Sequence, residues 1–175
     1  MEIYSKVCSH LAEGAAWHSR TATELRKMPN KRGYARIHDD QASGDSQKLI
    51  CFNKMLRDHL MISPVPNMQM VAKVETYSIN TFDDFKNHFR VWVAREGEYL
   101  EVLNCAIDAS REKDMTVYHK LCEMAQSVKI EAMRAEWICA SLADCGWEKH
   151  HCAVVSKWLH DQAETAPGDW NYNIG

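Results

Sequence analysis

The chain has 175 residues, enough for one domain to bury a hydrophobic core without help from disulfides or metals. The helix breakers Gly (7) and Pro (4) are scarce, whereas strong helix formers are plentiful. This composition favours an all-α protein over a fold of strands and turns. The net charge of -3 and the lack of an apolar run of about 18 residues argue against nucleic acid and membrane as partners.

The seven cysteines are an odd number, spread singly along the chain without a Cys-x-x-Cys pair. This pattern indicates reduced, mostly buried thiols rather than a disulfide framework or a zinc knuckle. The first ten residues also lack the layout of a signal peptide. We therefore expect a cytoplasmic protein.

Hydrophobic residues at helical spacing predict four long helices and a shorter fifth one. Their expected ranges are 2–27, 34–61, 82–110, 114–143 and 147–164. Between the second and third helices, residues 63–80 hold two prolines and show no helical period. Thr81, Asp83 and Asp84 offer capping and favourable dipole interactions at the start of the third helix.

This order predicts a four-helix up-down bundle with one long crossover between the second and third helices and a short C-terminal helix. We expect residues 1–163 to form this single domain and residues 164–175 to be an irregular tail.

Polar residues interrupt two of the apolar stripes. Asp45 lies on the stripe of the second helix, with Lys48 three residues later, and Glu96 lies between Trp92 and Tyr99 on the third. Carboxylates on an apolar face predict a polar site inside the bundle. A solvated Asp45–Lys48 pair at i, i+3 spacing is the alternative for the second helix.

Residues 66–137 carry a recognisable layout. A Pro-Asn crossover leads into a capped helix with an inward Glu96, and the short turn EKDMT leads into a helix with a Val-Lys-Ile-Glu step. This layout resembles the ferritin-like superfamily of bacterial non-haem ferritins and bacterioferritins. The resemblance implies iron oxidation and storage, with self-association from a dimer up to a shell.

The family's di-iron centre uses one Glu on the first helix, Glu-x-x-His on the second, one Glu on the third and Glu-x-x-His or a variant on the fourth. By this resemblance Glu13 and Glu96 match the single glutamates and are candidate metal ligands. The paired motifs fall on Asp45-Ser-Gln-Lys48, or three residues later on Lys48–Cys51, and on Gln126-Ser-Val-Lys129.

Neither paired motif keeps a histidine. We therefore expect a degenerate centre in which Lys48 and Lys129 supply positive charge to carboxylates that would otherwise be buried and unpaired. On this reading the protein is not a ferroxidase, although iron is a possible ligand. Haem is not expected, because Ser46 occupies the position that matches the family's haem methionine.

Four further residues are weaker metal candidates. They are His18, Glu131, Glu148 and His151. A lone histidine on an apolar face, such as His18, is more often a hydrogen-bonded core residue, and the Glu148-x-x-His151 spacing lies outside the expected bundle.

Three functions remain open. The first is an iron-binding or iron-storage-related protein without its own oxidation site. The second is a metal-free bundle that acts in protein-protein interaction, for which the six tryptophans would suit a partner surface. The third is a carboxylate-bridged oxidase with a rearranged ligand set of Glu13, His18, Glu96 and Glu131.

Overall fold

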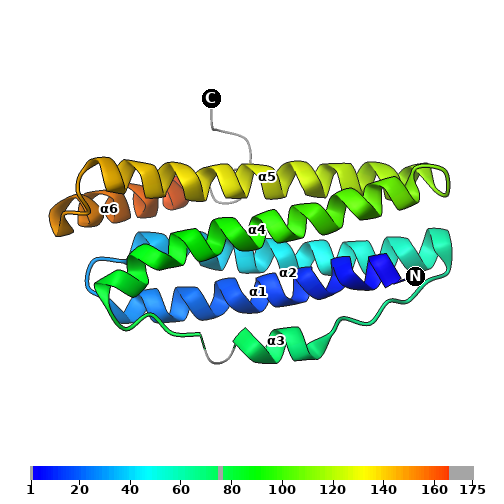
Figure 1. Ribbon diagram of the computed structural model, residues 1–175, viewed down its shortest axis with the longest axis horizontal. Coiled ribbons are helices and arrows are strands. Elements are labelled where there is room, and N and C mark those ends of the chain that lie inside the picture. Colours follow the sequence, from blue (N-terminus) through cyan, green and yellow to red (C-terminus); the bar gives the residue numbers. More distant parts are fainter. Residues whose placement is uncertain (1, 75–76, 166–175) are drawn as a thin grey trace.

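The structure is a computed structural model that describes residues 2–74 and 77–165, with the backbone only for residues 162–165. The described residues form six helices and no strand (Figure 1). The helices are α1 (Glu2–Lys27), α2 (Arg32–Leu60), α3 (Met68–Val74), α4 (Phe82–Ser110), α5 (Met115–Asp144) and α6 (Lys149–Thr165). The all-α prediction is confirmed. Within the described residues, no helix is long and apolar enough to cross a membrane.

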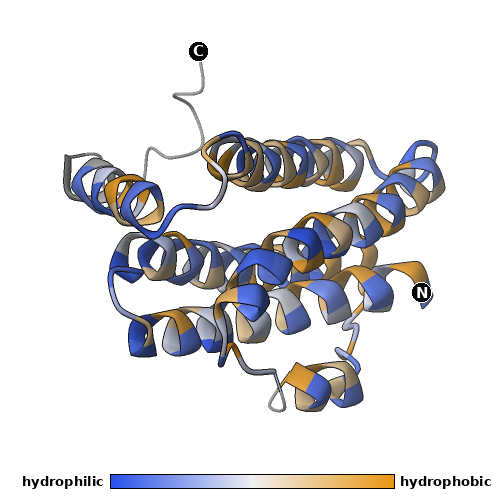
Figure 2. Ribbon diagram, turned by 60° about the vertical axis from the view of Figure 1, so that its left-hand side comes forward, coloured by the Kyte–Doolittle hydropathy of each residue, from blue (hydrophilic) through white to orange (hydrophobic). Residues whose placement is uncertain are grey.

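The helices pack mainly in two pairs. α1 lies along α2, and α4 lies along α5. α1 also contacts α4, and α2 contacts α5 and α6 (Figure 1). Hydrophobic and hydrophilic residues alternate around each long helix (Figure 2), as expected for helices with one buried face.

The predicted start of the third helix has the expected cap. The Thr81 hydroxyl accepts a hydrogen bond from the Asp84 N–H at 3.1 Å, and the Asp84 carboxylate accepts one from the Thr81 N–H at 2.8 Å. This reciprocal pair is a capping box, which satisfies two N–H groups that the helix leaves unpaired. At the start of α5, the Asp114 side chain accepts from the Val117 N–H in the same way.

Two segments differ from the sequence-based expectation. The connection between α2 and α4 contains the short helix α3, which packs on α1 and is too short to show a periodic pattern. α6 continues to Thr165, so residues 164–165 belong to a helix and not to the expected irregular tail. The rest of that tail lies outside the described residues.

The cysteines are less buried than expected. Only Cys8 and Cys152 are buried, and the rest are partly or fully exposed. All seven are free thiols, as predicted.

The hydrophobic core is divided into two clusters. One contains Trp17, Tyr34, Phe85, Phe89 and Leu142, near the end that α6 covers. The other contains Tyr4, Leu11, Phe52, Leu103 and Leu121. In α2, α4 and α5 a buried polar or charged side chain lies between the segments that feed the two clusters, and α1 adds the buried His18 next to Trp17. A polar layer therefore crosses the middle of the protein.

Candidate functional site

The polar layer contains a buried charged cluster, formed by Asp45, Lys48, Glu96 and Glu131. The three acids are 4–6% exposed, and they come from α2, α4 and α5. The Lys48 ammonium donates to Glu131 Oε1 at 3.0 Å and to Asp45 Oδ1 at 3.3 Å. One cation therefore joins carboxylates of two different helices.

Glu96 and Glu131 have further hydrogen bonds from neutral groups. The Trp92 indole N–H donates to Glu96 Oε1 at 3.1 Å, and the Ser127 hydroxyl donates to Glu131 Oε1 at 3.0 Å. Such donors compensate part of the cost of removing a carboxylate from water.

The charged cluster holds three carboxyl groups and one ammonium group, so negative charge is in excess. Burial, together with the neighbouring Glu131, raises the pKa of Asp45 to about 7 and that of Glu96 to about 8. Burial also acts to lower the pKa of Lys48, but the attraction of Glu131 and Asp45 outweighs it, and the pKa is raised. Lys48 thus stays charged, while the raised pKa values of Asp45 and Glu96 favour the protonated form of these two carboxyl groups.

Gly14 makes room for the charged cluster on α1. A Cβ atom at this position would lie 2.6 Å from Asp45 Oδ2, closer than real contacts allow. The missing side chain therefore lets the Asp45 carboxyl group approach the α1 backbone.

A small cavity of about 20 Å³ lies beside the charged cluster. This volume has room for about one water molecule. The residues that line it are His10, Glu13, Gly14, His18, Asp45, Arg95, Glu96, Glu98 and Tyr99.

Glu13 belongs to the rim of this cavity and not to the charged cluster. Its Oε1 lies 3.2 Å from an Arg95 guanidinium nitrogen, and its side chain is 16% exposed. The first-helix glutamate that the resemblance named is thus paired with an arginine of α4.

A histidine row, formed by His18, His38 and His88, continues the polar layer from the charged cluster. All three are buried, and His18 Nε2 lies 3.4 Å from Glu96 Oε1. His18 Nδ1 and His38 Nδ1 are 2.7 Å apart, so one ring donates and the other accepts. His88 Nδ1 contacts the Phe85 carbonyl oxygen.

Aromatic side chains surround the histidine row. The His38 ring lies 4.5 Å from the Trp92 ring and 5.5 Å from the Trp17 ring, measured between centroids. Burial in these surroundings lowers the pKa of His18 and of His88 to about 4, and that of His38 well below its usual value. The row is therefore neutral at physiological pH.

The sequence-based candidates fall into two groups. His18, Asp45, Lys48, Glu96 and Glu131 meet inside the protein. Gln126 and Lys129 are exposed on α5, so the expected inward orientation of this pair is corrected. Cys51 is also exposed, which disfavours the alternative register Lys48–Cys51. Glu148 and His151 lie 3.5 Å apart on the surface beside the start of α6.

The phase of α5 explains the correction. By hydropathy alone, Ala125 and Ala132 fit the buried face of α5, whereas the structure buries Met124 and Glu131, one position earlier. The buried face of α5 includes Arg134 as well as Glu131, and a charged pair is what a hydropathy pattern places on the outside.

Sequence reasoning also missed His38, His88 and Arg134. The spacing of each residue along its helix could have placed it on the buried face. His38 follows Tyr34 by four residues, and His88 lies between Phe85 and Trp92 on the same apolar stripe. Arg134 follows Glu131 by three residues, which is the spacing of Asp45 and Lys48.

A pair of metal ions does not fit the charged cluster as it stands. The Lys48 ammonium lies between two carboxylates where a metal would have to bind, and neither Asp45 nor Glu131 is followed by a histidine at i+3. Among the described residues, no group of three or more His, Cys, Asp or Glu side chains is arranged to hold a metal ion.

No family model matches the chain, and no curated protein or solved structure matches it either.

Proposed function

We propose that this chain is a ferritin-like protein in which an internal lysine has replaced the metal centre, and that it handles iron as a non-oxidising subunit. The single observation that carries the proposal is the Lys48 ammonium, shared between Asp45 and Glu131 in the middle of the protein.

The element order supports a ferritin-like four-helix up-down bundle. Two helix pairs are joined by a long connection between α2 and α4, whose described part includes α3 (Figure 1). A shorter helix follows the last long one. One crossover between two helix pairs is the ferritin-like arrangement.

The buried motifs support the same relationship. α2 presents Asp45 and Lys48 to the interior, and α5 presents Glu131 and Arg134. Both have the spacing of the family's Glu-x-x-His, with the carboxylate kept and a permanent cation at the position of the histidine. Cations at both positions oppose metal binding, because a metal ion would have to displace or approach them.

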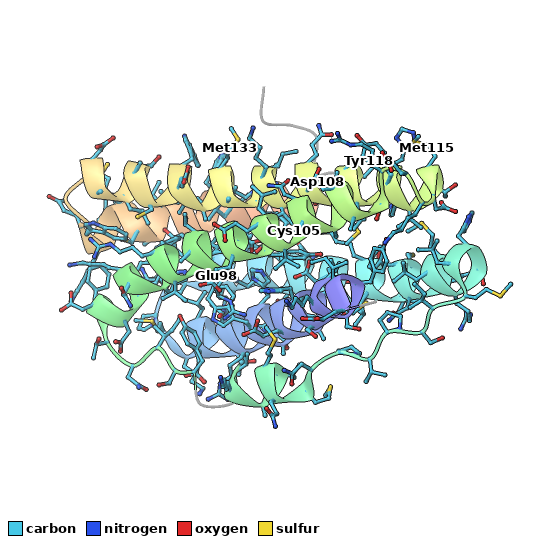
Figure 3. The ribbon with its side chains drawn as sticks, turned by 45° about the vertical axis from the view of Figure 1, so that its right-hand side comes forward. Glu98, Cys105, Asp108, Met115, Tyr118 and Met133 are labelled. Atoms are coloured by element: carbon cyan, nitrogen blue, oxygen red, sulfur yellow. The ribbon has the colours of Figure 1, made fainter. Side chains whose placement is uncertain are left out.

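Iron would then be held away from the charged cluster. Carboxylates are the ligands that hard iron ions favour, and α4 exposes a series of acids. Its members are Glu98, Glu101 and Asp108, and Glu112 is exposed in the turn that follows α4. Figure 3 labels two of them, Glu98 and Asp108, along α4.

Iron loading tests the proposal. Fe(II) is added in air, and iron per subunit is then measured on a sizing column. We expect a large particle that carries iron, with Fe(II) oxidised no faster than in protein-free buffer. Rapid, saturable oxidation would contradict the loss of the centre, and a small iron-free particle would contradict a role in iron handling.

A repaired variant gives a second test. The substitutions Asp45→Glu, Lys48→His and Arg134→His restore a Glu-x-x-His motif on α2 and on α5. We expect the triple variant to bind Co(II), a spectroscopic probe for iron sites, with at least tenfold higher affinity than the original chain. Lys129→His on the exposed face of α5 is the matched control. If this variant and the triple variant gain the same Co(II) affinity, the family's two paired motifs do not correspond to Asp45–Lys48 and Glu131–Arg134.

A second candidate function is protein-protein interaction by a metal-free bundle. The observation that favours it is an exposed apolar surface on α5 and α6, where the Trp137 and Trp158 rings lie 5.8 Å apart and Met133 and Val154 are about half exposed. Clustered exposed apolar side chains often mark interaction sites.

The rearranged oxidase is supported least. This function requires Lys48 to turn away from the carboxylates and Glu13 to separate from Arg95. Both side chains are instead held by ion pairs, Lys48 with Glu131 and Glu13 with Arg95.

A further inference from the structure

α6 and the turn between α1 and α2 lie at the same end of the protein (Figure 1). Residues of these segments line a groove with a basic character. Its cavity volume is about 730 Å³, within the range of small-molecule sites. The basic side chains of this basic groove are Arg26, Lys27, Arg32, His150, Lys157 and His160. None of the described residues that line it is acidic, although the whole chain carries a net charge of -3.

The packing of α6 on α2 forms the floor of the basic groove. A Cβ atom on Gly33 would lie 1.7 Å from the Ser156 carbonyl oxygen, so only glycine allows this approach. The Gly33 N–H donates to the Ser156 hydroxyl at 3.0 Å, and the Tyr34 hydroxyl donates to the Cys152 carbonyl at 2.9 Å. These buried contacts fix the basic side chains of α6 opposite those of the turn.

The first turn of α2 adds partial positive charge. The N-cap residue Lys31 makes no capping hydrogen bond with its side chain, which points instead toward the Phe85 ring at 4.3 Å. Arg32 and Gly33 place the first turn of α2 at the basic groove, and this turn carries no acidic residue to compensate the positive end of the dipole. Helix N-termini of this kind favour phosphate groups.

Acidic neighbours neutralise the basic groove only in part. Arg26 pairs with Asp39, Lys27 with Glu24, and Lys157 with Asp161. Arg32 has no ion-pair partner among the described residues, and its side chain is exposed. Ion pairs of exposed lysine and arginine side chains are weak. The long side chains of Arg26, Lys27 and Lys157 can therefore turn toward a bound anion.

We infer that the basic groove binds a small phosphorylated molecule, with the phosphates on Arg32 and Lys157 and an apolar or aromatic part against Met28 and Val154. The apolar lining distinguishes this site from one for inorganic phosphate alone, and its size fits a nucleotide better than a nucleic acid chain. This inference does not depend on the proposed role in iron handling.

Titration calorimetry with ATP as the probe tests the inference at low ionic strength, since salt screens exposed charges. We expect saturable binding that Arg32→Gln/Lys157→Gln weakens at least tenfold, because charge-assisted contacts to phosphate are lost. Pyrophosphate is expected to compete with ATP, but to bind less tightly because it lacks the apolar part.

Lys54→Gln/Arg57→Gln is the matched control, because it removes two exposed charges from the other end of α2. Unchanged circular dichroism and thermal midpoints establish that both double variants fold. Equal ATP affinity in the two double variants would overturn the inference. So would the absence of saturable binding to the original chain, or an oligonucleotide that binds the basic groove more tightly than ATP.

Discussion

The charged cluster and the histidine row lie side by side in the same interior, and the protein stabilises them by opposite means. In the charged cluster, an ammonium group compensates carboxylates from two helices. In the histidine row, no opposite charge is needed, because burial keeps the imidazoles neutral. The comparison teaches that ionisable side chains remain buried either through an internal counter-ion or through loss of their own charge.

The two regions also differ in how completely their polar atoms are paired. Lys48, Asp45 and Glu131 share hydrogen bonds, whereas the Nε2 atoms of His38 and His88 have no partner within the described structure. A buried unpaired nitrogen costs roughly 1–3 kcal/mol. The histidine row is therefore a cost to folding that the surrounding aromatic packing offsets.

The largest effect is expected from removing the internal counter-ion. Lys48→Met keeps most of the side-chain volume but leaves Asp45 and Glu131 without their cation. We expect the free energy of unfolding to fall by roughly 2–4 kcal/mol. This is less than the loss of a partner from a fully buried ion pair would cost, because the Lys48 side chain is 18% exposed. Urea denaturation near pH 8, where the carboxyls are most ionised, measures it.

Lys129→Met is the control, because Lys129 is exposed on α5 and its loss should change stability by less than about 0.5 kcal/mol. If both variants lose the same stability, the ammonium of Lys48 does not compensate the buried acids.

A pH profile separates the two regions. The raised pKa values of Asp45 and Glu96 mean that the folded state retains protons that the unfolded chain has released, so stability falls as pH rises from about 4 through 7–8. The lowered histidine pKa values act in the opposite direction, since stability falls as pH drops from 6.5 toward 4. The histidine effect fades as pH rises above 6.5, so the carboxyl groups dominate the profile toward pH 8.

We therefore expect stability to fall from pH 6.5 to 8 by about 1.4 kcal/mol per pH unit for each carboxyl group that is protonated only in the folded state. Glu96→Gln should make this fall shallower, while His88→Phe should change only the acid side of the profile. Thermal unfolding in a series of buffers provides the measurement. An unaltered slope above pH 6.5 in Glu96→Gln would show that Glu96 does not retain a proton.

A smaller effect is expected from closing the space that Gly14 leaves for Asp45. Alanine in place of a mid-helix glycine usually stabilises a protein by up to about 1 kcal/mol. Gly97→Ala should give this gain, because nothing lies within 4 Å of its Cβ position. Gly14→Ala should be at least about 1 kcal/mol less stable than Gly97→Ala, because the new methyl group displaces the Asp45 carboxyl.

The double variant Gly14→Ala/Asp45→Ala completes a cycle, measured by urea denaturation. With the carboxyl gone, Gly14→Ala should no longer destabilise. A Gly14→Ala effect that is the same with and without Asp45 would place the strain elsewhere.

The sequence by itself determined the helical class, the approximate ends of the long helices and the N-terminal cap of α4, because these depend on local periodicity and on side chains a few residues apart. It also singled out Asp45, Lys48 and Glu96 as polar residues on apolar stripes. Only the tertiary structure decided that Lys48 reaches Glu131, 83 positions away along the chain.

The phase of α5 shows why. From the sequence of α5 alone, Glu131 and Arg134 would be placed on the surface. The structure buries them because α2 brings Lys48 next to Glu131, and the cost of burying a charge depends on its partner and not on its own helix. The same holds for Gly33 and the basic groove: the sequence marks a turn, but only the packing of α6 on α2 brings basic side chains from distant segments to one surface.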